Sequence, residues 1–182
     1  MAPASVRTVG KYKMNDSNPV VPKKPDEVLQ GVHIFRGYLA VLEQEAVVAA
    51  LRDVAQKAPT YSPITGFGKP MSVKMTSAGS YGWFSDRKGY RYIDTHPSGV
   101  PWPSIPKEIL QIWHALVPDA PDPECCLINF YGEKARMGLH QDRDEANFEW
   151  PVLSISLGDD ALFRIGGTDR KDPTKSTWLT SG

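Results

Sequence analysis

A histidine and an aspartate stand two residues apart, as His140 and Asp142 in the run Leu139-His140-Gln141-Asp142. Residues i and i+2 of an extended strand point to the same side, so this imidazole and this carboxylate can bind one metal ion together. They would supply two-thirds of the 2-His-1-carboxylate face that binds Fe(II) in non-haem oxygenases. A His-x-Asp pair taken alone is a weak signal, since an isolated histidine is more often a hydrogen-bonded structural residue.

Two further features favour a metal site. The pair lies in an acidic block, because residues 119–149 hold eight acids and three bases. Upstream, Leu127, Asn129 and Tyr131 alternate along an expected strand and share one face. An amide and a phenol on one face of a core strand need polar partners if they are buried. A small dicarboxylate bound to the metal would supply such partners.

A second cluster combines aromatic and basic side chains. Residues 61–91 hold five bases against one acid, Asp86. Such blocks are more often solvated surface than binding sites, and a single aromatic is more often part of a core. Aromatics interleaved with bases in a Gly- and Ser-rich segment nevertheless favour nucleic-acid binding, because bases stack on the rings while phosphates meet the charges. The residues concerned are Tyr81, Trp83, Tyr90, Tyr92, Arg87, Lys88 and Arg91.

Bulk composition indicates one compact domain. The chain has 182 residues, of which 41% are hydrophobic and 23% charged, with 21 basic and 21 acidic side chains. The sequence contains no apolar stretch long enough to span a bilayer and no apolar segment typical of a signal peptide, so we expect a cytoplasmic protein. Adjacent Cys125 and Cys126 would point to opposite faces of a strand, which makes an intramolecular disulfide between them geometrically poor.

The periodicity predicts helices and loops first, and a β-rich part afterwards. Residues 1–30 contain four prolines and predict a flexible arm. Apolar residues at i, i+3, i+4 and i+7 predict one helix through residues 47–54, ending at Pro59, and a second beginning near Pro106. The stripe of the second helix is formed by Ile109, Ile112, Trp113 and Leu116.

Strand-like runs occur at residues 31–38, 71–76, 125–131, 152–158 and 161–167. Residues 176–182 look like the start of another strand that stops, which would leave an unpaired edge. From this ending we expect that the sequence is truncated.

The run from Cys126 through Gly167 resembles the AlkB family of nucleic-acid demethylases, in its asparagine–tyrosine strand, its metal loop and the two strands that follow. The similarity extends back to Met71-Ser72-Val73-Lys74-Met75-Thr76, Gly82-Trp83, Gly89-Tyr90 and Pro101-Trp102-Pro103, and covers residues 31–182. It implies an α+β fold with a double-stranded β-helix (jelly-roll) core, here C-terminally incomplete, preceded by two helices and a nucleotide-recognition lid. Residues 1–30 would remain as the arm.

The resemblance also implies roles for individual residues. His140 and Asp142 match ligands of Fe(II), and Asn129 and Tyr131 match residues that bind 2-oxoglutarate. Trp83 matches the aromatic that stacks on a flipped damaged base. The remaining substrate-binding residues that the family pattern implies are Tyr90, Met75, Asp144, Glu145 and Arg170.

The implied reaction is oxidative demethylation of N-alkylated bases. It consumes dioxygen and 2-oxoglutarate and releases succinate, carbon dioxide and formaldehyde. The implied partner is DNA, preferably single-stranded or with a flipped damaged base, with RNA as a second option; a monomer without a membrane partner is expected. A base methylated on its Watson–Crick edge pairs badly, so its extrusion costs less than that of a normal base.

The chain departs from the family pattern after Asp142. Its four histidines are His33, His96, His114 and His140, so none follows the aspartate. The C-terminal arginines that bind the far carboxylate of 2-oxoglutarate are also missing. A fragment of a complete enzyme would explain both, and a naturally short, inactive form is the other explanation. Two other functions stay open: a non-catalytic nucleic-acid-binding module, and a related oxygenase acting on a protein or a small molecule.

Overall fold

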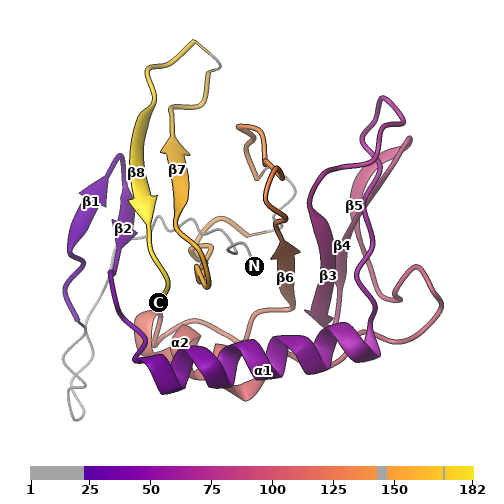
Figure 1. The fold of residues 1–182 in the computed structure, drawn as a ribbon, viewed down its shortest axis with the longest axis horizontal. Coiled ribbons are helices and arrows are strands. Elements are labelled where there is room, and N and C mark those ends of the chain that lie inside the picture. Colours follow the sequence, from indigo (N-terminus) through magenta and orange to yellow (C-terminus); the bar gives the residue numbers. More distant parts are fainter. Residues whose placement is uncertain (1–22, 143–146, 170) are drawn as a thin grey trace.

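The computed structural model describes residues 23–142, 147–169 and 171–182. Two helices lie along one side of this part of the chain, and the strands extend away from them (Figure 1). The elements in chain order are β1 (Glu27–Leu29), β2 (Val32–Ile34), α1 (Val41–Lys57), β3 (Lys74–Gly79), β4 (Gly82–Asp86), β5 (Gly89–Ile93), α2 (Lys107–Leu116), β6 (Cys125–Phe130), β7 (Ala161–Ile165) and β8 (Lys175–Leu179).

Both predicted helices are present. The backbone N–H of Ala40, just before α1, donates to the Glu43 carboxylate at 2.7 Å, which satisfies one amide that the helix leaves unpaired. The four stripe residues of α2 are all buried, at 7–8% exposure. They form the main hydrophobic cluster together with Leu39, Val47 and Leu157, so α2 anchors the helical layer to the rest of the fold.

The strands form four antiparallel pairs: β1–β2, β3–β6, β4–β5 and β7–β8. An α+β composition is thus confirmed, whereas the described residues form no closed barrel. Residues 27–29, which the sequence places in the arm, form β1 because their backbone finds a partner in β2. Cys125 and Cys126 are both free thiols, in agreement with the strand argument.

Two strand predictions need correction. Residues 152–158 are largely apolar but form no strand, because a strand also needs a neighbouring backbone to pair with. At Ser156 the carbonyl instead accepts a hydrogen bond from the N–H of Gly182 at 2.9 Å. The last predicted strand is β8, and β7 pairs with it from Ala161↔Leu179 to Ile165↔Lys175. The expected unpaired edge is therefore paired on one side.

The β3–β6 sheet has two faces of different character. Thr76 and Ala78 of β3 face α1: the Thr76 hydroxyl donates to the Ala58 carbonyl at 2.7 Å, and Ala78 packs with Val54 and Ile128. Because successive strand residues alternate, the neighbouring positions of both strands lie on the face away from α1. Asn129 is on that second face, directly opposite Met75.

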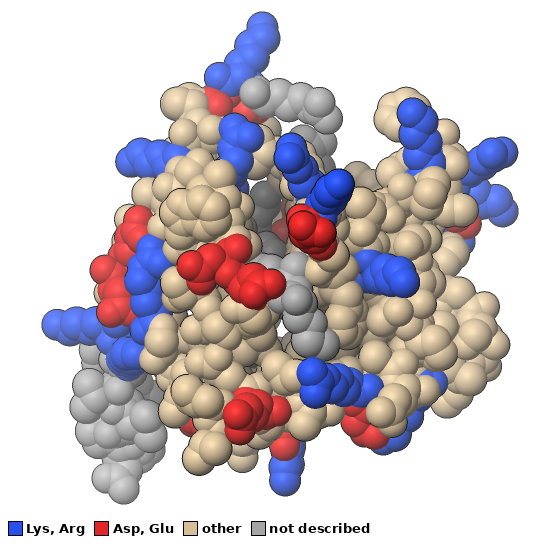
Figure 2. Space-filling view, in the orientation of Figure 1, with Lys and Arg blue, Asp and Glu red and all other residues tan. Residues whose placement is uncertain are grey.

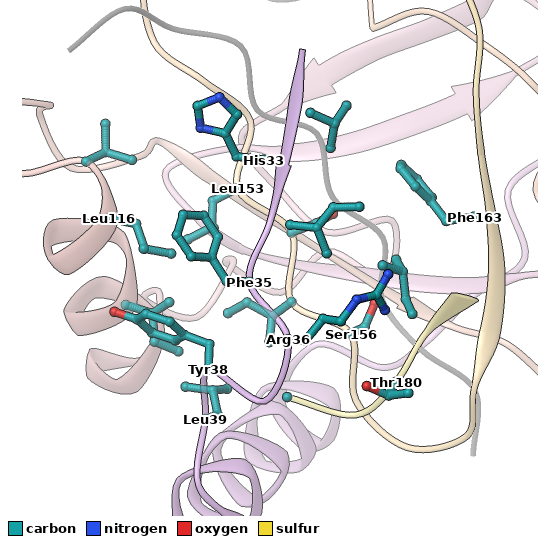
Figure 3. Close-up of a pocket in the computed structure, with 18 residues that line it drawn as sticks. His33, Phe35, Arg36, Tyr38, Leu39, Leu116, Leu153, Ser156, Phe163 and Thr180 are labelled. Atoms are coloured by element: carbon teal, nitrogen blue, oxygen red, sulfur yellow. The ribbon is translucent and has the colours of Figure 1, made fainter. Parts of the chain in front are cut away.

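An apolar cavity of about 90 Å³ lies between β2, α2 and residues 153–156 (Figure 3). Phe35, Leu116 and Leu153 point toward it, and His33 lies at its border. None of the predicted metal-binding or co-substrate-binding residues lines this cavity.

Neither α1 nor α2, the helices of the described ranges, is long and apolar enough to cross a membrane.

Candidate metal centre and nucleic-acid interface

The structure brings the predicted metal ligands together. Nε2 of His140 lies 3.3 Å from Oδ1 of Asp142, and the two side chains are 55% and 32% exposed. Nδ1 of His140 lies 2.8 Å from the Gly138 carbonyl oxygen. A carbonyl oxygen only accepts, so Nδ1 donates, and in the neutral ring Nε2 directs its lone pair toward the carboxylate. When the ring is neutral, the Nε2 lone pair and the carboxylate face each other, and a cation between them would stabilise both.

The spacing fits one ion. Ligand atoms about 2.1 Å from a metal and at a right angle to each other are about 3.0 Å apart, close to the separation found here. The hydrogen bond to the Gly138 carbonyl orients the ring, as in metal sites where the second ring nitrogen has a partner of its own. His140 and Asp142 therefore fit Fe(II) as two of its ligands.

Hydrogen bonds at two points hold the loop that carries this pair. Near its start, the backbone N–H of Arg136 donates to the Ser72 hydroxyl at 3.2 Å, just before β3. At the site itself, Nε2 of Gln141 donates to the Thr168 carbonyl, which follows β7. His140 and Asp142 thus lie between the β3–β6 sheet and the β7–β8 hairpin.

The other histidines take different places. Both ring nitrogens of His96 are engaged in the interior, by the Ser98 hydroxyl at 2.7 Å and the Pro59 carbonyl at 2.8 Å. His114 lies 2.7 Å from Asp122 on the surface, and His33 borders the apolar cavity. Within residues 23–142, 147–169 and 171–182, no group of three His, Cys, Asp or Glu side chains could hold a metal ion.

The side-chain amide of Asn129, on the face of the β3–β6 sheet away from α1, is a candidate binding group for the co-substrate. Its Oδ1 is buried and has no hydrogen-bond partner among the described residues. A buried polar atom without a partner costs free energy, and the oxygen and nitrogen of an amide exchange places by a half-turn. Asn129 can therefore donate to an incoming carboxylate. Burial raises the pKa of Tyr131, two residues on, so its phenol stays protonated at neutral pH and can donate as well.

Two of the predicted aromatic residues, Trp83 and Tyr90, stack on each other on the β4–β5 hairpin. The rings of Trp83 and Tyr90 lie with centroids 6.0 Å apart and planes 21° from parallel, and Tyr90 is 57% exposed. They come from opposite strands, in which Ser85 pairs with Tyr90. The hairpin is stiffened across its strands by Arg91, which donates to Asp86 through two nitrogens at 2.8 and 3.0 Å.

Sequence reasoning missed Tyr61, which links the two halves of the site. Its backbone exchanges two hydrogen bonds with Met75, at 2.8 and 2.9 Å, and its hydroxyl donates to the Trp83 carbonyl at 2.8 Å. Burial raises the pKa of Tyr61 to about 12, so the hydroxyl keeps its proton. Met75 itself is 1% exposed. Tyr61 therefore couples the strand opposite Asn129 to the stacking hairpin.

Charge supports the same interface. Lysine and arginine side chains project from the end of the molecule that holds the tip of the β4–β5 hairpin (Figure 2). The basic residues of this segment are Lys69, Lys74, Arg87, Lys88 and Arg91. Three predicted substrate residues, Asp144, Glu145 and Arg170, lie outside the described residues.

Comparison with known proteins identifies the family of the chain. Residues 31–182 match the family model of the 2OG-Fe(II) oxygenase superfamily. The chain is 52% identical to an alpha-ketoglutarate-dependent dioxygenase AlkB homolog of Caulobacter vibrioides (strain NA1000 / CB15N), over 87% of this chain and 73% of that protein. It is 38% identical to the alpha-ketoglutarate-dependent dioxygenase AlkB of Escherichia coli (strain K12), over 76% and 66% respectively. A DNA N(6)-methyladenine demethylase of Arabidopsis thaliana is 29% identical over 82% of this chain and 37% of its own length. The chain therefore belongs to the AlkB family of 2-oxoglutarate- and Fe(II)-dependent dioxygenases.

Proposed function

We propose that this protein repairs DNA by oxidative removal of N-alkyl groups from nucleobases, using Fe(II), 2-oxoglutarate and dioxygen. The proposal rests on two features that occur together. His140 and Asp142 have a spacing that fits one metal ion, and the rings of Trp83 and Tyr90 are stacked. Tyr61 links the stacking hairpin to the β3–β6 sheet, so substrate and co-substrate groups belong to one framework.

Each side chain has a defined task in this proposal. Nε2 of His140 and the Asp142 carboxylate hold the iron, which supplies the oxidising chemistry when it is bound with 2-oxoglutarate and dioxygen. Asn129 and Tyr131 donate hydrogen bonds to 2-oxoglutarate, which satisfies the buried Asn129 amide. Both residues bind and orient the co-substrate.

Base recognition falls to the β4–β5 hairpin, which acts as the nucleotide-recognition lid. Trp83 and Tyr90 offer ring faces to an extruded base. The family pattern adds Met75, Asp144, Glu145 and Arg170 as further contacts of the base. A methylated base that carries positive charge favours such an aromatic, acid-lined environment. The basic residues near the hairpin tip hold the phosphates on either side.

The domain boundaries, the oligomeric state, the location and the form of the substrate are proposed on the same grounds. We propose that the dioxygenase domain of residues 31–182 also includes β1, because β1 pairs with β2, and that the rest of the arm precedes it. We also propose that the protein acts as a monomer in the cytoplasm. Its substrate is DNA, single-stranded or with a flipped damaged base, and RNA of the same chemistry is a second substrate.

The proposal is tested with a single-stranded oligonucleotide that carries one N-methylated base, incubated with the protein, Fe(II), 2-oxoglutarate and air. We expect formaldehyde release and loss of the methyl group by mass spectrometry, both abolished in His140→Ala. We expect Trp83→Ala to weaken binding, while Trp178→Ala, an equally large change at a 59% exposed tryptophan of β8, leaves binding unchanged. Intact binding in Trp83→Ala would instead favour an oxygenase acting on a protein or a small molecule.

One observation favours a second candidate, a nucleic-acid-binding module without turnover. The described residues supply two protein ligands to the metal, where the facial triad has three. This candidate predicts tight, Trp83-dependent binding of the methylated oligonucleotide without formaldehyde release. The same experiment therefore separates the two functions.

A further inference from the structure

Ser77, in the middle of β3, carries a buried hydroxyl that the rest of the fold does not satisfy. The residue is 0% exposed, and its Oγ has no hydrogen-bond partner among the described residues. A buried hydroxyl without a partner costs free energy, and most buried polar atoms in proteins have one. An alanine would fill almost the same space without that cost. The hydroxyl of Ser77 therefore calls for a partner from outside the described chain.

The preceding residue, Thr76, offers a direct comparison. Thr76 is equally buried, but its hydroxyl donates to the Ala58 carbonyl at 2.7 Å, toward α1. Because successive strand residues alternate, Ser77 points to the opposite face of the sheet. Of two adjacent buried hydroxyls, the one toward the helix has a protein partner, and the other has none among the described residues. The unmet hydrogen bond lies on the face away from α1.

Asn129 of β6 places a second such group on this face. Strands β3 and β6 lie side by side (Figure 1), and Ser77 pairs with Leu127 in their ladder. Asn129 is two residues further along β6 and on the same face, which makes it the diagonal neighbour of Ser77. Diagonal neighbours in an antiparallel pair lie about 7–8 Å apart. The buried Oδ1 of Asn129 also has no partner among the described residues, so one ligand with several oxygen atoms would satisfy both side chains.

Strand β3 is also tied to the loop that carries the metal ligands. Ser72 lies two residues before β3, and its hydroxyl accepts from the Arg136 N–H at 3.2 Å and donates to the Arg136 carbonyl at 3.3 Å. The loop then continues to His140 and Asp142. The strand that carries Ser77 therefore belongs to the same framework as the metal ligands.

We propose that Ser77 is a further binding residue for 2-oxoglutarate, whose hydroxyl donates to the same carboxylate as the side-chain amide of Asn129. This inference rests on the proposed function and adds a residue to its co-substrate site. An ionised carboxylate only accepts hydrogen bonds and can accept several, so it meets the Ser77 hydroxyl and the turned Asn129 amide together. Hydrogen bonds to charged groups are the stronger ones, which makes the loss of this hydroxyl measurable.

Calorimetry of 2-oxoglutarate binding, carried out without oxygen and with Fe(II) present, tests this assignment. Ser77→Ala removes the hydroxyl. Thr76→Val is the matched control, because it removes the adjacent buried hydroxyl on the other face of the strand. Equilibrium dialysis against Fe(II) and thermal denaturation without 2-oxoglutarate, on the same three proteins, separate a change in co-substrate binding from changes in metal binding and in folding.

We expect Ser77→Ala to bind 2-oxoglutarate at least about 10-fold more weakly, with Fe(II) affinity within about twofold of wild type. Its Tm should be unchanged or higher, because a buried hydroxyl without a partner has been removed. Thr76→Val should show the reverse. Its Tm should fall, because the Ala58 carbonyl loses its hydrogen bond, while its 2-oxoglutarate affinity stays within about twofold of wild type.

Wild-type affinity for 2-oxoglutarate in Ser77→Ala would overturn the assignment and leave the proposed function standing. A lower Tm of Ser77→Ala would overturn it as well, since the hydroxyl would then have a partner within the folded chain. Equal losses of 2-oxoglutarate affinity in both variants, or a matching loss of Fe(II) affinity in Ser77→Ala, would have the same consequence. If the wild-type protein binds no 2-oxoglutarate, the proposed function itself falls.

Discussion

Gly82, the first residue of β4, has no room for a side chain. A Cβ at this position would overlap Cζ2 and Cε2 of Trp102 and lie 2.8 Å from Cη2 of the same ring, which is 7% exposed. The Trp102 ring cannot move freely, because its Nε1 donates to the Ile93 carbonyl at 2.9 Å and Ile93 is the ladder partner of Gly82. Gly82→Ala must therefore displace the ring or open the base of the hairpin that carries Trp83.

The magnitude follows from these contacts. Overpacking of a filled interior costs about 1–3 kcal/mol, and loss of the indole hydrogen bond costs about 0.5–1.5 kcal/mol. The free energy of unfolding should fall by about 1.5–4.5 kcal/mol, which lowers Tm by roughly 3–18 °C for a chain of this size. Oligonucleotide binding should weaken as well, since Trp83 is the next residue along the strand.

Urea and thermal denaturation followed by circular dichroism measure this effect. Gly66→Ala is the matched control, because a Cβ there meets nothing within 4 Å and should change the free energy of unfolding by less than about 0.5 kcal/mol. In a Trp102→Phe background, which removes the clashing ring atoms, Gly82→Ala should cost little. A Gly82→Ala protein as stable as wild type, or an equal loss of stability in both backgrounds, would show that the Trp102 ring does not exclude a side chain at position 82.

Three further predictions concern buried and charged groups. Asn129→Leu should leave Tm unchanged or raise it, because it removes a buried polar atom without a partner, yet 2-oxoglutarate binding by calorimetry should be lost; a clear loss of stability would contradict this. Burial raises the pKa of Cys126 to about 12, so a Cys125→Ser variant should show no fast-reacting thiol with a disulfide reagent at pH 8 until it is denatured. Hydrogen bonds from Arg91 and from the Lys88 amide lower the Asp86 pKa from 3.8 to about 2, so the stabilisation of the hairpin is complete above pH 3.8 and is lost as pH falls through 2. Amide exchange of β4 and β5 across this range should show that loss, and Asp86→Asn should abolish the pH dependence.

Local sequence patterns predicted the helices, because the position of a helix depends on burial of one apolar face. The four-residue stripe of α2 is buried as its spacing requires, because one contact surface suffices to fix a helix. Residues 152–158 show the limit of the same reasoning: their apolar run indicates burial, but a strand also needs a partner whose position depends on the whole fold. The pairing of β8 with β7 was missed for the same reason.

In the site, too, contacts set by spacing along the chain could be predicted, whereas contacts set by the pairing of distant segments could not. His140 and Asp142 are two residues apart, so their spacing alone keeps them near each other, although they lie in a loop and not in the extended strand that the sequence argument assumed. The contact between Trp83 and Tyr90 depends on the register of two strands, which composition does not specify. Tyr61 gave no signal, because a lone tyrosine in a Pro- and Ser-containing segment has many ordinary uses. Its importance lies in partners 14 and 22 residues away along the chain.

If His140 and Asp142 bind the catalytic iron, loss of either side chain must lower the affinity for Fe(II), which anaerobic equilibrium dialysis measures. His114→Ala is a close control, because it removes the other exposed histidine that faces an aspartate, Asp122 at 2.7 Å. We expect His140→Ala and Asp142→Asn each to weaken Fe(II) binding by at least about 100-fold, whereas His114→Ala should bind as wild type. Fe(II) binding that survives both site variants unchanged would contradict it.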